Sequence, residues 1–476
     1  MIPRTLFYFF PEMVLLGFGL LILCADPLME EPQKSFLGKA TLFALVSGIA
    51  ATLLLWGKQS SLFGTLYLFD TYSLFFKLVF LGAALVTVAV SSRYLLLTGI
   101  PRGEYLALIL FATVGMMVMA SGTDFLSIYL GLEVMAIASY ALVGLLRKER
   151  ASLEGALKYF LLGAFNSGVI LYGIALLYGA IGTTNLVHMG ALFSKTPPPK
   201  MFLAAIALLT AGLAFKISAF PFHMWVPDAY EGSPTPVAGF ISVASKAASF
   251  AVLLRISLSV MAPLKGNWQM LVVTLSVMTM TFGNLLALSQ ESLKRMLAYS
   301  SIAHAGYLLI GVAVGAPSGF SAILFYFVAY GLMNLGAFAM IVLIAKKERR
   351  AESLEDFRGL ATQHPGWALC FLVFLLSLAG IPPSAGFIGK FYLFAGAIQS
   401  GLYGLATIAV LNSVLALSYY FRVVRGMYMI EGGSLEISSS WGLRFSLILL
   451  ALLTLAIGFY PVPFLKASQQ AVASLR

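Results

Sequence analysis

The sequence predicts an all-α polytopic membrane protein with about 14 transmembrane helices. Of its 476 residues, 60% are hydrophobic and only 10% are charged, which is too few charges to cover a soluble domain. Apolar runs of about 20 residues recur along the whole chain, and each is long enough to cross the hydrocarbon core of a bilayer. The formal net charge of +11 does not indicate nucleic-acid binding, because most basic residues lie in short loops, where they set topology.

The apolar runs divide the chain into fourteen expected spans. The first follows Arg4 and has Leu-Ile-Leu before Cys24, so we expect it to remain as a membrane helix and not to be cleaved as a signal peptide. Span 12 is too long for one crossing and contains Gly380-Ile-Pro-Pro-Ser-Ala-Gly386, which predicts two half-helices with a break between them. The spans are expected at 10–25, 36–56, 72–92, 104–121, 123–146, 154–180, 200–220, 235–258, 268–289, 296–315, 319–345, 367–398, 402–428 and 443–463.

Loop charges predict the orientation. When each loop is numbered by the span that it follows, the odd loops hold 17 Lys and Arg, whereas the even loops and both termini hold 8. The positive-inside rule then places the odd loops in the cytoplasm and both termini outside. An even number of spans agrees with both termini lying on one side.

The stretch from Leu213 to Lys246 predicts an interrupted helix beside buried charge. An apolar run reaches Lys216, several prolines and a glycine follow, and a new apolar run begins at Val237 and carries Lys246. An interrupted helix at membrane depth must face protein or water, because its freed amides find no partner in lipid. A lysine there is expensive to bury and is by default a candidate functional residue. We interpret the stretch as half of an ion path. His223 and Asp228, in the loop after span 7, are expected near its extracellular or its cytoplasmic mouth, depending on how the break folds, and the positive-inside count favours the cytoplasmic one.

Few charged residues lie inside the expected spans. Glu133 is the one carboxylate well inside a span, whereas Glu12, Asp70 and Asp124 are expected near span ends, where water reaches them. Lys77 is either a functional buried lysine or a lysine whose long aliphatic stem lets its ammonium reach the membrane–water interface. The basic residues expected within spans are Lys77, Lys158, Lys216, Lys246 and Lys390.

These charges suit proton transfer. A carboxylate left alone in hydrocarbon takes up a proton, so we expect Glu133 to have a lysine partner on another span, either Lys216 or Lys158. Burial lowers the pKa of a lysine and a nearby carboxylate raises it. Movement of a carboxylate can therefore switch a lysine between its charged and neutral forms, which arginine does not allow. The alternatives are a structural ion pair at Glu133 and a cation that caps the carbonyl end of a half-helix, above all at Lys390.

Other polar residues are candidate connections. His304, with Tyr299, Ser300 and Ser301 on the same expected helix, either relays protons between the two halves or is a hydrogen-bonded core histidine. Lys158, next to Tyr159, is a plausible connecting position. Lys294 and Arg295 are interpreted as topology determinants.

No resident cofactor is expected. Two cysteines, Cys24 and Cys370, are too few for an iron–sulfur cluster, which takes four thiolates, and we expect both to be small buried hydrophobic residues. The four histidines are scattered, unlike a haem or zinc site, and no Gly-rich phosphate loop follows a strand pattern.

The broken spans indicate an internal repeat. Residues 101–258 (spans 4–8) and 259–428 (spans 9–13) would each contain five spans with one broken helix and its lysine. Broken helices at matching places in two halves are typical of carriers, and an odd number of spans per half makes the halves inverted. Residues 1–100 would form a preceding three-helix segment, and 429–476 the last span and a tail.

Three motifs resemble one known family. The strings Phe215-Lys-Ile-Ser-Ala-Phe-Pro-Phe-His-Met-Trp-Val-Pro-Asp-Ala-Tyr230, Lys294 to Tyr307, and Gly380-Ile-Pro-Pro-Ser-Ala-Gly-Phe-Ile-Gly-Lys390 resemble, in order, the signatures of the antiporter-like subunits of respiratory complex I. Within this family the chain is most similar to the subunit N branch. Tyr230-Glu-Gly-Ser-Pro-Thr-Pro favours it, as does lysine in place of glutamate at position 390, and the chain ends soon after span 14 without the lateral helix of subunit L.

The resemblance implies a fold and a function. The fold would be fourteen helices in two inverted five-helix repeats, with broken helices 7 and 12. It also implies a Glu133–Lys216 pair, a connecting Lys246 and an exit at Lys390. The chain would be a proton-translocating subunit of NADH–quinone oxidoreductase in the bacterial inner membrane, beside other membrane subunits. NADH, FMN, iron–sulfur clusters and quinone would bind to partner subunits.

Three other functions stay open from the sequence. A subunit of a multi-component Na⁺/H⁺ antiporter shares the signatures. A structural spacer between pumping subunits would tolerate neutral residues at Glu133, Lys216 and Lys390. A ferredoxin- or hydrogenase-linked complex is also compatible, because the electron donor leaves no trace in this chain.

Overall fold

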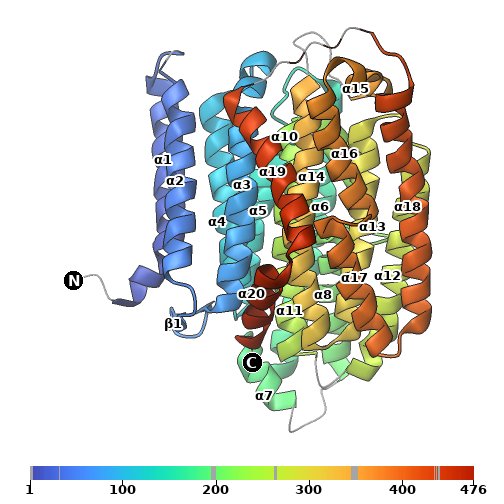
Figure 1. The fold of residues 1–476 in the computed structure, drawn as a ribbon. Coiled ribbons are helices and arrows are strands. Elements are labelled where there is room, and N and C mark those ends of the chain that lie inside the picture. Colours follow the sequence, from blue (N-terminus) through green and yellow to red (C-terminus); the bar gives the residue numbers. More distant parts are fainter. Residues whose placement is uncertain are drawn as a thin grey trace.

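Long apolar helices stand side by side through most of the molecule (Figure 1). The structure is a computed structural model that describes residues 4–31, 33–193, 200–261, 265–344, 352–433, 435, 437 and 440–475. Within these residues, the helices of the N-terminal part are α1 (Phe10–Ala25), α2 (Ser35–Leu54), α3 (Thr71–Thr98), α4 (Arg102–Ser121), α5 (Phe125–Val143), α6 (Arg150–Ile181), α7 (Leu186–Phe193), α8 (Lys200–Lys216), α9 (Trp225–Gly232), α10 (Thr235–Phe240) and α11 (Lys246–Ser259).

The later helices follow the same pattern of long crossings. They are α12 (Lys265–Leu288), α13 (Leu293–Val314), α14 (Pro317–Ile344), α15 (Leu360–Gln363), α16 (Pro365–Ala379), α17 (Ala385–Gln399), α18 (Tyr403–Met429), α19 (Trp441–Phe459) and α20 (Val462–Ala473). Short 3₁₀ turns occupy Arg4–Phe9, Asp26–Leu28 and Leu354–Phe357. A π-helical turn, Ile241–Ser245, joins α10 to α11.

The span count agrees with the sequence. Twelve helices in the described ranges are long and apolar enough to cross a membrane. The two expected spans missing from that set are 7 and 12, because each is divided into two shorter helices. Span 12 is divided as expected, into α16 and α17. Span 7 was expected to end near residue 220, but its second half continues as α9, so Asp228 lies in a helix and not in a loop.

The loops alternate between the two ends of the bundle. The hairpin of β1 (Ser60–Leu62) and β2 (Tyr67–Phe69), the helix α7 and both marked termini lie at the lower end, whereas α15 lies at the upper end (Figure 1). The upper end therefore carries the odd loops and the lower end the even loops. Four basic residues counted in the loop after span 11, Lys346, Lys347, Arg349 and Arg350, lie outside the described residues.

Two halves repeat one order of elements. In α4 to α11 and again in α12 to α18, three long helices precede a broken helix, and a further long helix follows it. Since each half crosses five times, α4 starts at the upper end and α12 at the lower end, which makes the halves inverted. The domain boundaries given above remain a prediction.

Glycines let helices touch in both halves. A Cβ at Gly115 in α4 would lie 2.5 Å from the backbone nitrogen of Met135 in α5. A Cβ at Gly306 in α13 would lie 2.5 Å from the backbone nitrogen of Met280 in α12. Small residues at such contacts allow close packing in lipid, where apolar burial does not drive helix association.

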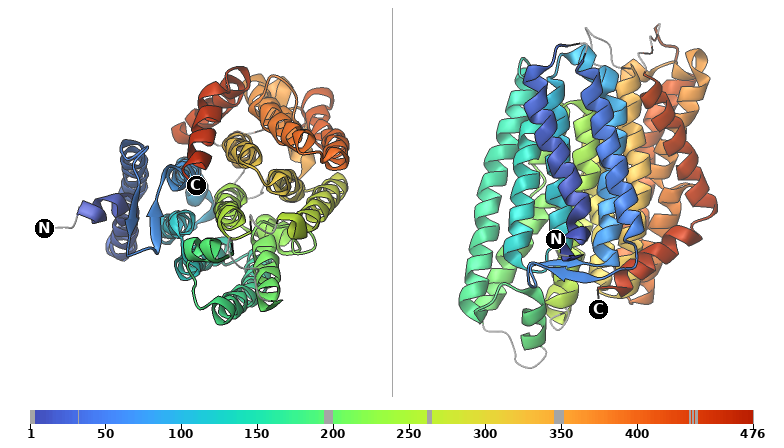
Figure 2. Two further views of the ribbon diagram at one scale, coloured as in Figure 1. Left: turned by 90° about the horizontal axis from the view of Figure 1, so that it is seen from below. Right: turned by 90° about the vertical axis from the view of Figure 1, so that its left-hand side faces the viewer.

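Some elements were not expected. The hairpin crosses below α1 to α3, which lie to one side of the bundle (Figure 2), and α20 is a short helix after the last span. Cys24 is exposed in this chain, contrary to expectation, because α1 lies at the edge; Cys370 is only partly buried.

Candidate functional site

Broken helix 7 places Lys216 at the end of α8, inside the bundle. The backbone turns at Ser218, where φ is 65°, and side chains satisfy the backbone groups that the break frees. The indole of Trp225 donates to the carbonyl of Phe215 at 3.2 Å, and Thr279 accepts from the amide of Phe220 at 3.0 Å. The break is therefore enclosed by protein, as an interrupted helix at membrane depth requires.

The Lys216 side chain is 3% exposed. Its ammonium lies 3.5 Å from the hydroxyl of Tyr140 and over that ring, 5.8 Å from its centroid. These are weak contacts for a buried charge.

Broken helix 12 places Lys390 against the end of α16. Its ammonium donates to the carbonyls of Leu378 and Ala379 at 3.0 and 2.9 Å, and lies 4.7 Å from the ring centroid of Tyr307. Lysine thus caps the carbonyl end of a half-helix, which was the structural alternative for this residue.

Lys246 joins the two halves. It begins α11 directly after the π-helical turn, and its ammonium donates to the carbonyl and the hydroxyl of Ser301 in α13, at 2.7 and 2.8 Å. The π turn widens the helix just before this residue, and such turns are frequent at functional sites. In the same turn, Ser242 accepts from the amide of Asn334 in α14.

His304 lies one turn further along α13. Its Nδ1 is 2.6 Å from the hydroxyl of Tyr326, and its Nε2 is 3.3 Å from that of Tyr420. The charges of Lys246 and Lys390 both act on this imidazole. His304 is thus hydrogen-bonded in the core, as the structural alternative expected. Its part in proton relay stays a prediction.

A second histidine, His223, also lies among the buried groups near Lys246. His223 is 7% exposed and lies in the break between α8 and α9, within the field of Lys246. Its Nδ1 and the hydroxyl of Ser218 are buried without a protein hydrogen-bond partner. Buried polar atoms without a protein partner are typical positions for bound water. The sequence places His223 at a mouth, but it lies inside the bundle.

Glu133 does not form the expected ion pair. Within the described residues no ion pair joins it to Lys216, and Lys158 pairs with Glu154 and Asp228 instead. One oxygen of Glu133, Oε1, is buried without a hydrogen-bond partner. Its charge still acts on Lys216 and on Tyr140. Glu133 is therefore close enough for its charge to act on Lys216, but it forms no ion pair with it.

Lys158, unlike Lys216, Lys246 and Lys390, is not buried. Its side chain is 45% exposed and its ammonium lies 2.8 Å from Asp228 and 2.7 Å from Glu154. Asp228 also binds Arg295 at 2.9 Å, and Arg295 binds Glu231 at 2.7 Å. This network ties α9 to α6 and α13 near the odd-loop end.

Lys294 is buried beside that network. Its ammonium donates to the carbonyls of Glu231 and Ser233, both at 2.8 Å, and pairs with Glu352 at 3.0 Å. Lys294 and Arg295 therefore hold the end of α9, beyond any effect of their charge on topology.

The structure contradicts the water-exposed position expected for Glu12 and one of the two alternatives for Lys77, the stem that extends to the interface. Both are fully buried and form an ion pair of 2.8 Å. The hydroxyl of Tyr67 accepts from Lys77 at 2.8 Å and donates to Glu12 at 2.6 Å. The lysine does not reach the interface and the carboxylate does not meet water, because the β hairpin folds over both.

Asp70 and Asp124 are also buried, contrary to expectation. Asp70 caps α3 by accepting from the amide of Ser73 at 2.7 Å and pairs with Arg255 at 3.1 Å. Asp124 caps α5 by accepting from the amide of Leu126 at 2.9 Å. Arg255 is not among the basic residues expected within spans, yet it is 5% exposed. An N-cap aspartate before an apolar run was the signal available in the sequence.

No metal site is evident in the part of the chain that the structure describes, where no group of three or more His, Cys, Asp or Glu side chains could hold an ion. What the geometry provides is a series of titratable groups that runs through both halves, here called the buried row. It consists of the buried Lys216, His223, Lys246, His304 and Lys390, and of the half-buried Glu133. Such groups can pass protons, provided water joins them.

The sequence has clear relatives. The sequence model of the family described as "NADH:quinone oxidoreductase/Mrp antiporter, TM" matches residues 122–416. NADH-quinone oxidoreductase subunit N 2 of Solibacter usitatus (strain Ellin6076) is 44% identical over 492 residues, which cover 98% of this chain and 99% of that protein.

Solved structures share the fold. A chain of respiratory complex I from Thermus thermophilus with bound aureothin has a TM-score of 0.84 and 34% identity, covering 96% of this chain and 98% of that one. A chain of the Mrp complex from Dietzia sp. DQ12-45-1b has a TM-score of 0.88, covering 100% and 98%. At 22% identity this second likeness concerns the fold alone.

Proposed function

This chain belongs to the NADH:quinone oxidoreductase/Mrp antiporter family, and from that premise we propose that it is the proton-translocating subunit N of a NADH–quinone oxidoreductase. The observation that carries the proposal is the row of buried lysines and histidines beside two broken helices. A buried charge at membrane depth is costly, so a row of them is retained where charge must cross.

The proposed path follows the row. Protons move between Glu133 and Lys216, pass His223 and Lys246, and leave through His304 and Lys390. Water completes the steps at His223 and Ser218, where protein partners are lacking. Lys158 is proposed as an access position, because it is exposed and bound to the start of broken helix 7's second half through Asp228.

The surroundings of the chain are part of the same proposal. It resides in the bacterial inner membrane with both termini on the periplasmic side, since the odd loops carry the basic excess. It contacts neighbouring antiporter-like and small membrane subunits. NADH oxidation and quinone reduction take place on partner subunits that hold FMN and the iron–sulfur clusters, so this chain adds proton transfer and no redox centre.

Replacement of Lys216 tests the proposal. The complex carrying Lys216→Ala is reconstituted in vesicles, and proton uptake is measured per NADH oxidised. We expect less uptake per NADH with the complex fully assembled. Lys148→Gln, in the exposed loop after α5, is the matched control for loss of one lysine. Full uptake in Lys216→Ala would refute the role, and would favour the structural spacer if Glu133 and Lys390 variants behave alike.

The Na⁺/H⁺ antiporter remains the second candidate, because the matching family model covers both kinds of complex. The two differ in what drives transport. Proton uptake that depends on NADH and stops with quinone removed supports the oxidoreductase. Exchange of Na⁺ for H⁺ that continues without any redox donor would support the antiporter.

A further inference from the structure

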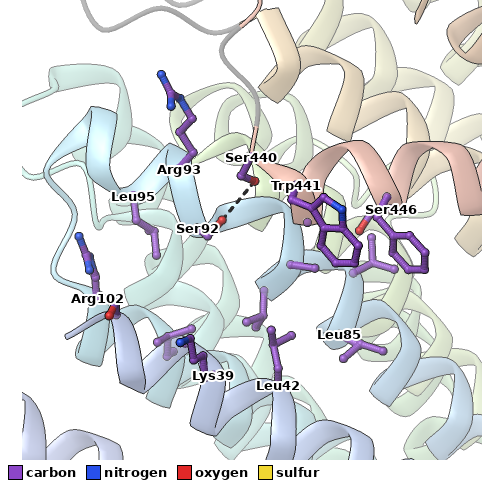
Figure 3. A pocket seen from close by; sticks show the side chains of 18 of the residues that line it. Lys39, Leu42, Leu85, Ser92, Arg93, Leu95, Arg102, Ser440, Trp441 and Ser446 are labelled. Carbon is purple, nitrogen blue, oxygen red and sulfur yellow. Dashed lines mark hydrogen bonds between the residues drawn. The ribbon is translucent and has the colours of Figure 1, made fainter. Parts of the chain in front are cut away.

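An apolar groove opens on the side of the bundle, and no residue of the buried row belongs to its lining. It lies between α2, α3 and α19, with a cavity volume of about 710 Å³. Leu42, Leu85 and Leu449 belong to its lining. Trp441 lies on one side of it (Figure 3). Its ring stacks on that of Phe445, with ring centroids 5.2 Å apart. Because the groove faces outward from a membrane-spanning bundle, its occupant comes from the bilayer or from another chain.

Basic side chains gather at one end of this groove. Lys34, Lys39, Arg93 and Arg102 line it, and none of the described lining residues is acidic. Lys39, Arg93 and Arg102 lie opposite Trp441 (Figure 3). Lys34 is already paired with Glu31 at 3.1 Å. Lys39 and Arg102 make no hydrogen bond or ion pair within the described residues, so both are available to an anion.

The groove has the depth of one lipid leaflet. Along α2 its lining runs from Ser35 to Val46, which at 1.5 Å per residue is about 16 Å. That is close to half of the roughly 30 Å hydrocarbon core of a bilayer. The basic residues lie at the odd-loop end, where α2 and α4 begin and α3 ends. A molecule with a charged head and apolar tails of leaflet length fits this distribution.

We propose that the groove binds one anionic phospholipid. The phosphate lies between Lys39, Arg93 and Arg102, and the acyl chains lie against α2, α3 and α19. Trp441, 78% exposed, sits at the depth of the headgroups, where tryptophan is enriched. Basic pockets between transmembrane helices on the cytoplasmic side suit such headgroups, which agrees with the predicted orientation of the odd loops. The lipid would fill the space that keeps α2 apart from α19.

A charge variant tests the headgroup contact. The complex containing the full chain is purified from membranes with Lys39→Gln and Arg102→Gln together, and phosphatidylglycerol retained per complex is counted by native mass spectrometry. We expect affinity to fall about 30-fold, at about fivefold for each basic residue near an anionic headgroup. The control, Lys148→Gln with Arg150→Gln, removes two charges at the same membrane side outside the groove and should retain the lipid.

A second variant tests the acyl-chain contact without changing charge. Gly38 lines the groove, and a Cβ there meets nothing within 4 Å, so Gly38→Trp can fold and fill the space. We expect it to lose phosphatidylglycerol, whereas Gly17→Trp, at an open position in α1 outside the groove, keeps it. Unchanged retention in both groove variants would overturn the proposal. Equal retention of phosphatidylcholine, or a helix of a partner subunit seen in the groove, would overturn it as well.

Discussion

The ammonium of Lys246 donates to both the carbonyl and the hydroxyl oxygen of Ser301, at 2.7 and 2.8 Å. Lys246 belongs to the last helix of the first half and Ser301 to the second helix of the other half. The ammonium of Lys246 is therefore a buried cation at the contact between the two halves. One turn beyond Ser301, His304 lies in the electrostatic field of the same cation. A change in the charge of Lys246 therefore acts on the imidazole of His304 in the second half.

Replacement of Lys246 by arginine separates proton transfer from structure. Arginine can still donate hydrogen bonds to the carbonyl and hydroxyl of Ser301, but its side chain stays charged in proteins. We expect Lys246→Arg to assemble normally and to take up fewer protons per NADH oxidised, measured in vesicles with the reconstituted complex. Ser301→Ala is the matched variant, because it removes one acceptor and leaves the carbonyl and the lysine. It should lower stability by roughly 1.5–3 kcal/mol at most and retain proton uptake. Normal uptake in Lys246→Arg would make Lys246 a structural donor.

Gly380 holds broken helix 12 open around Lys390. Its φ is 88°, and a Cβ there would lie 2.8 Å from Cδ of Lys390. We expect Gly380→Ala to displace the lysine from the carbonyls of Leu378 and Ala379, and to lower both proton uptake and the melting temperature of the complex. Gly401→Ala provides the control: it has the same kind of backbone, with φ of 77°, but open space at the Cβ.

In both glycine variants the new alanine must adopt a left-handed backbone conformation, which destabilises the protein by about 1–2 kcal/mol. The control should therefore show a small loss of stability and normal proton uptake. If the two variants lose uptake equally, the contact between Gly380 and Lys390 has no part in transport.

The buried pair Glu12–Lys77 should behave as one unit. Lys77→Met leaves a buried carboxylate without its cation, and breaking a buried pair from one side costs roughly 3–5 kcal/mol. We expect Lys77→Met and Glu12→Leu each to lower the amount of assembled complex, measured by native gel electrophoresis. The double variant should recover much of it, because an apolar pair of similar volume often replaces a buried ion pair without loss. Two single losses that simply add in the double variant would contradict this coupling.

The spans and the breaks could be predicted from the sequence, because apolar length and proline or glycine clusters are local properties. The expected span 10–25 coincides with α1, Phe10–Ala25, and the break at Gly380 was recognised from its own residues. The second half of span 7 was missed, since Trp225–Gly232 is short and begins beside two prolines. Only packing against α6 and α13 makes it a helix.

Partners of buried charges could not be predicted, because they depend on which helices meet. Lys77 and Glu12 are 65 positions apart and meet under a β hairpin that the sequence did not indicate. Asp70 and Arg255 meet across α3 and α11. Distance from a span end also proved a poor guide to solvent, since a residue near an end is buried wherever a loop folds over it.

Glu133 should matter for transport more than for stability. Its Oε1 has no hydrogen-bond partner and it forms no ion pair in the described structure, so Glu133→Gln breaks no strong contact. We expect the melting temperature of the complex to stay unchanged and proton uptake per NADH to fall, because the charge that acts on Lys216 is lost. Asp228→Asn is the opposite case, since Asp228 binds both Lys158 and Arg295, and its loss should lower stability. A marked loss of stability in Glu133→Gln would indicate that Glu133 holds the fold and that the first half of the path begins elsewhere.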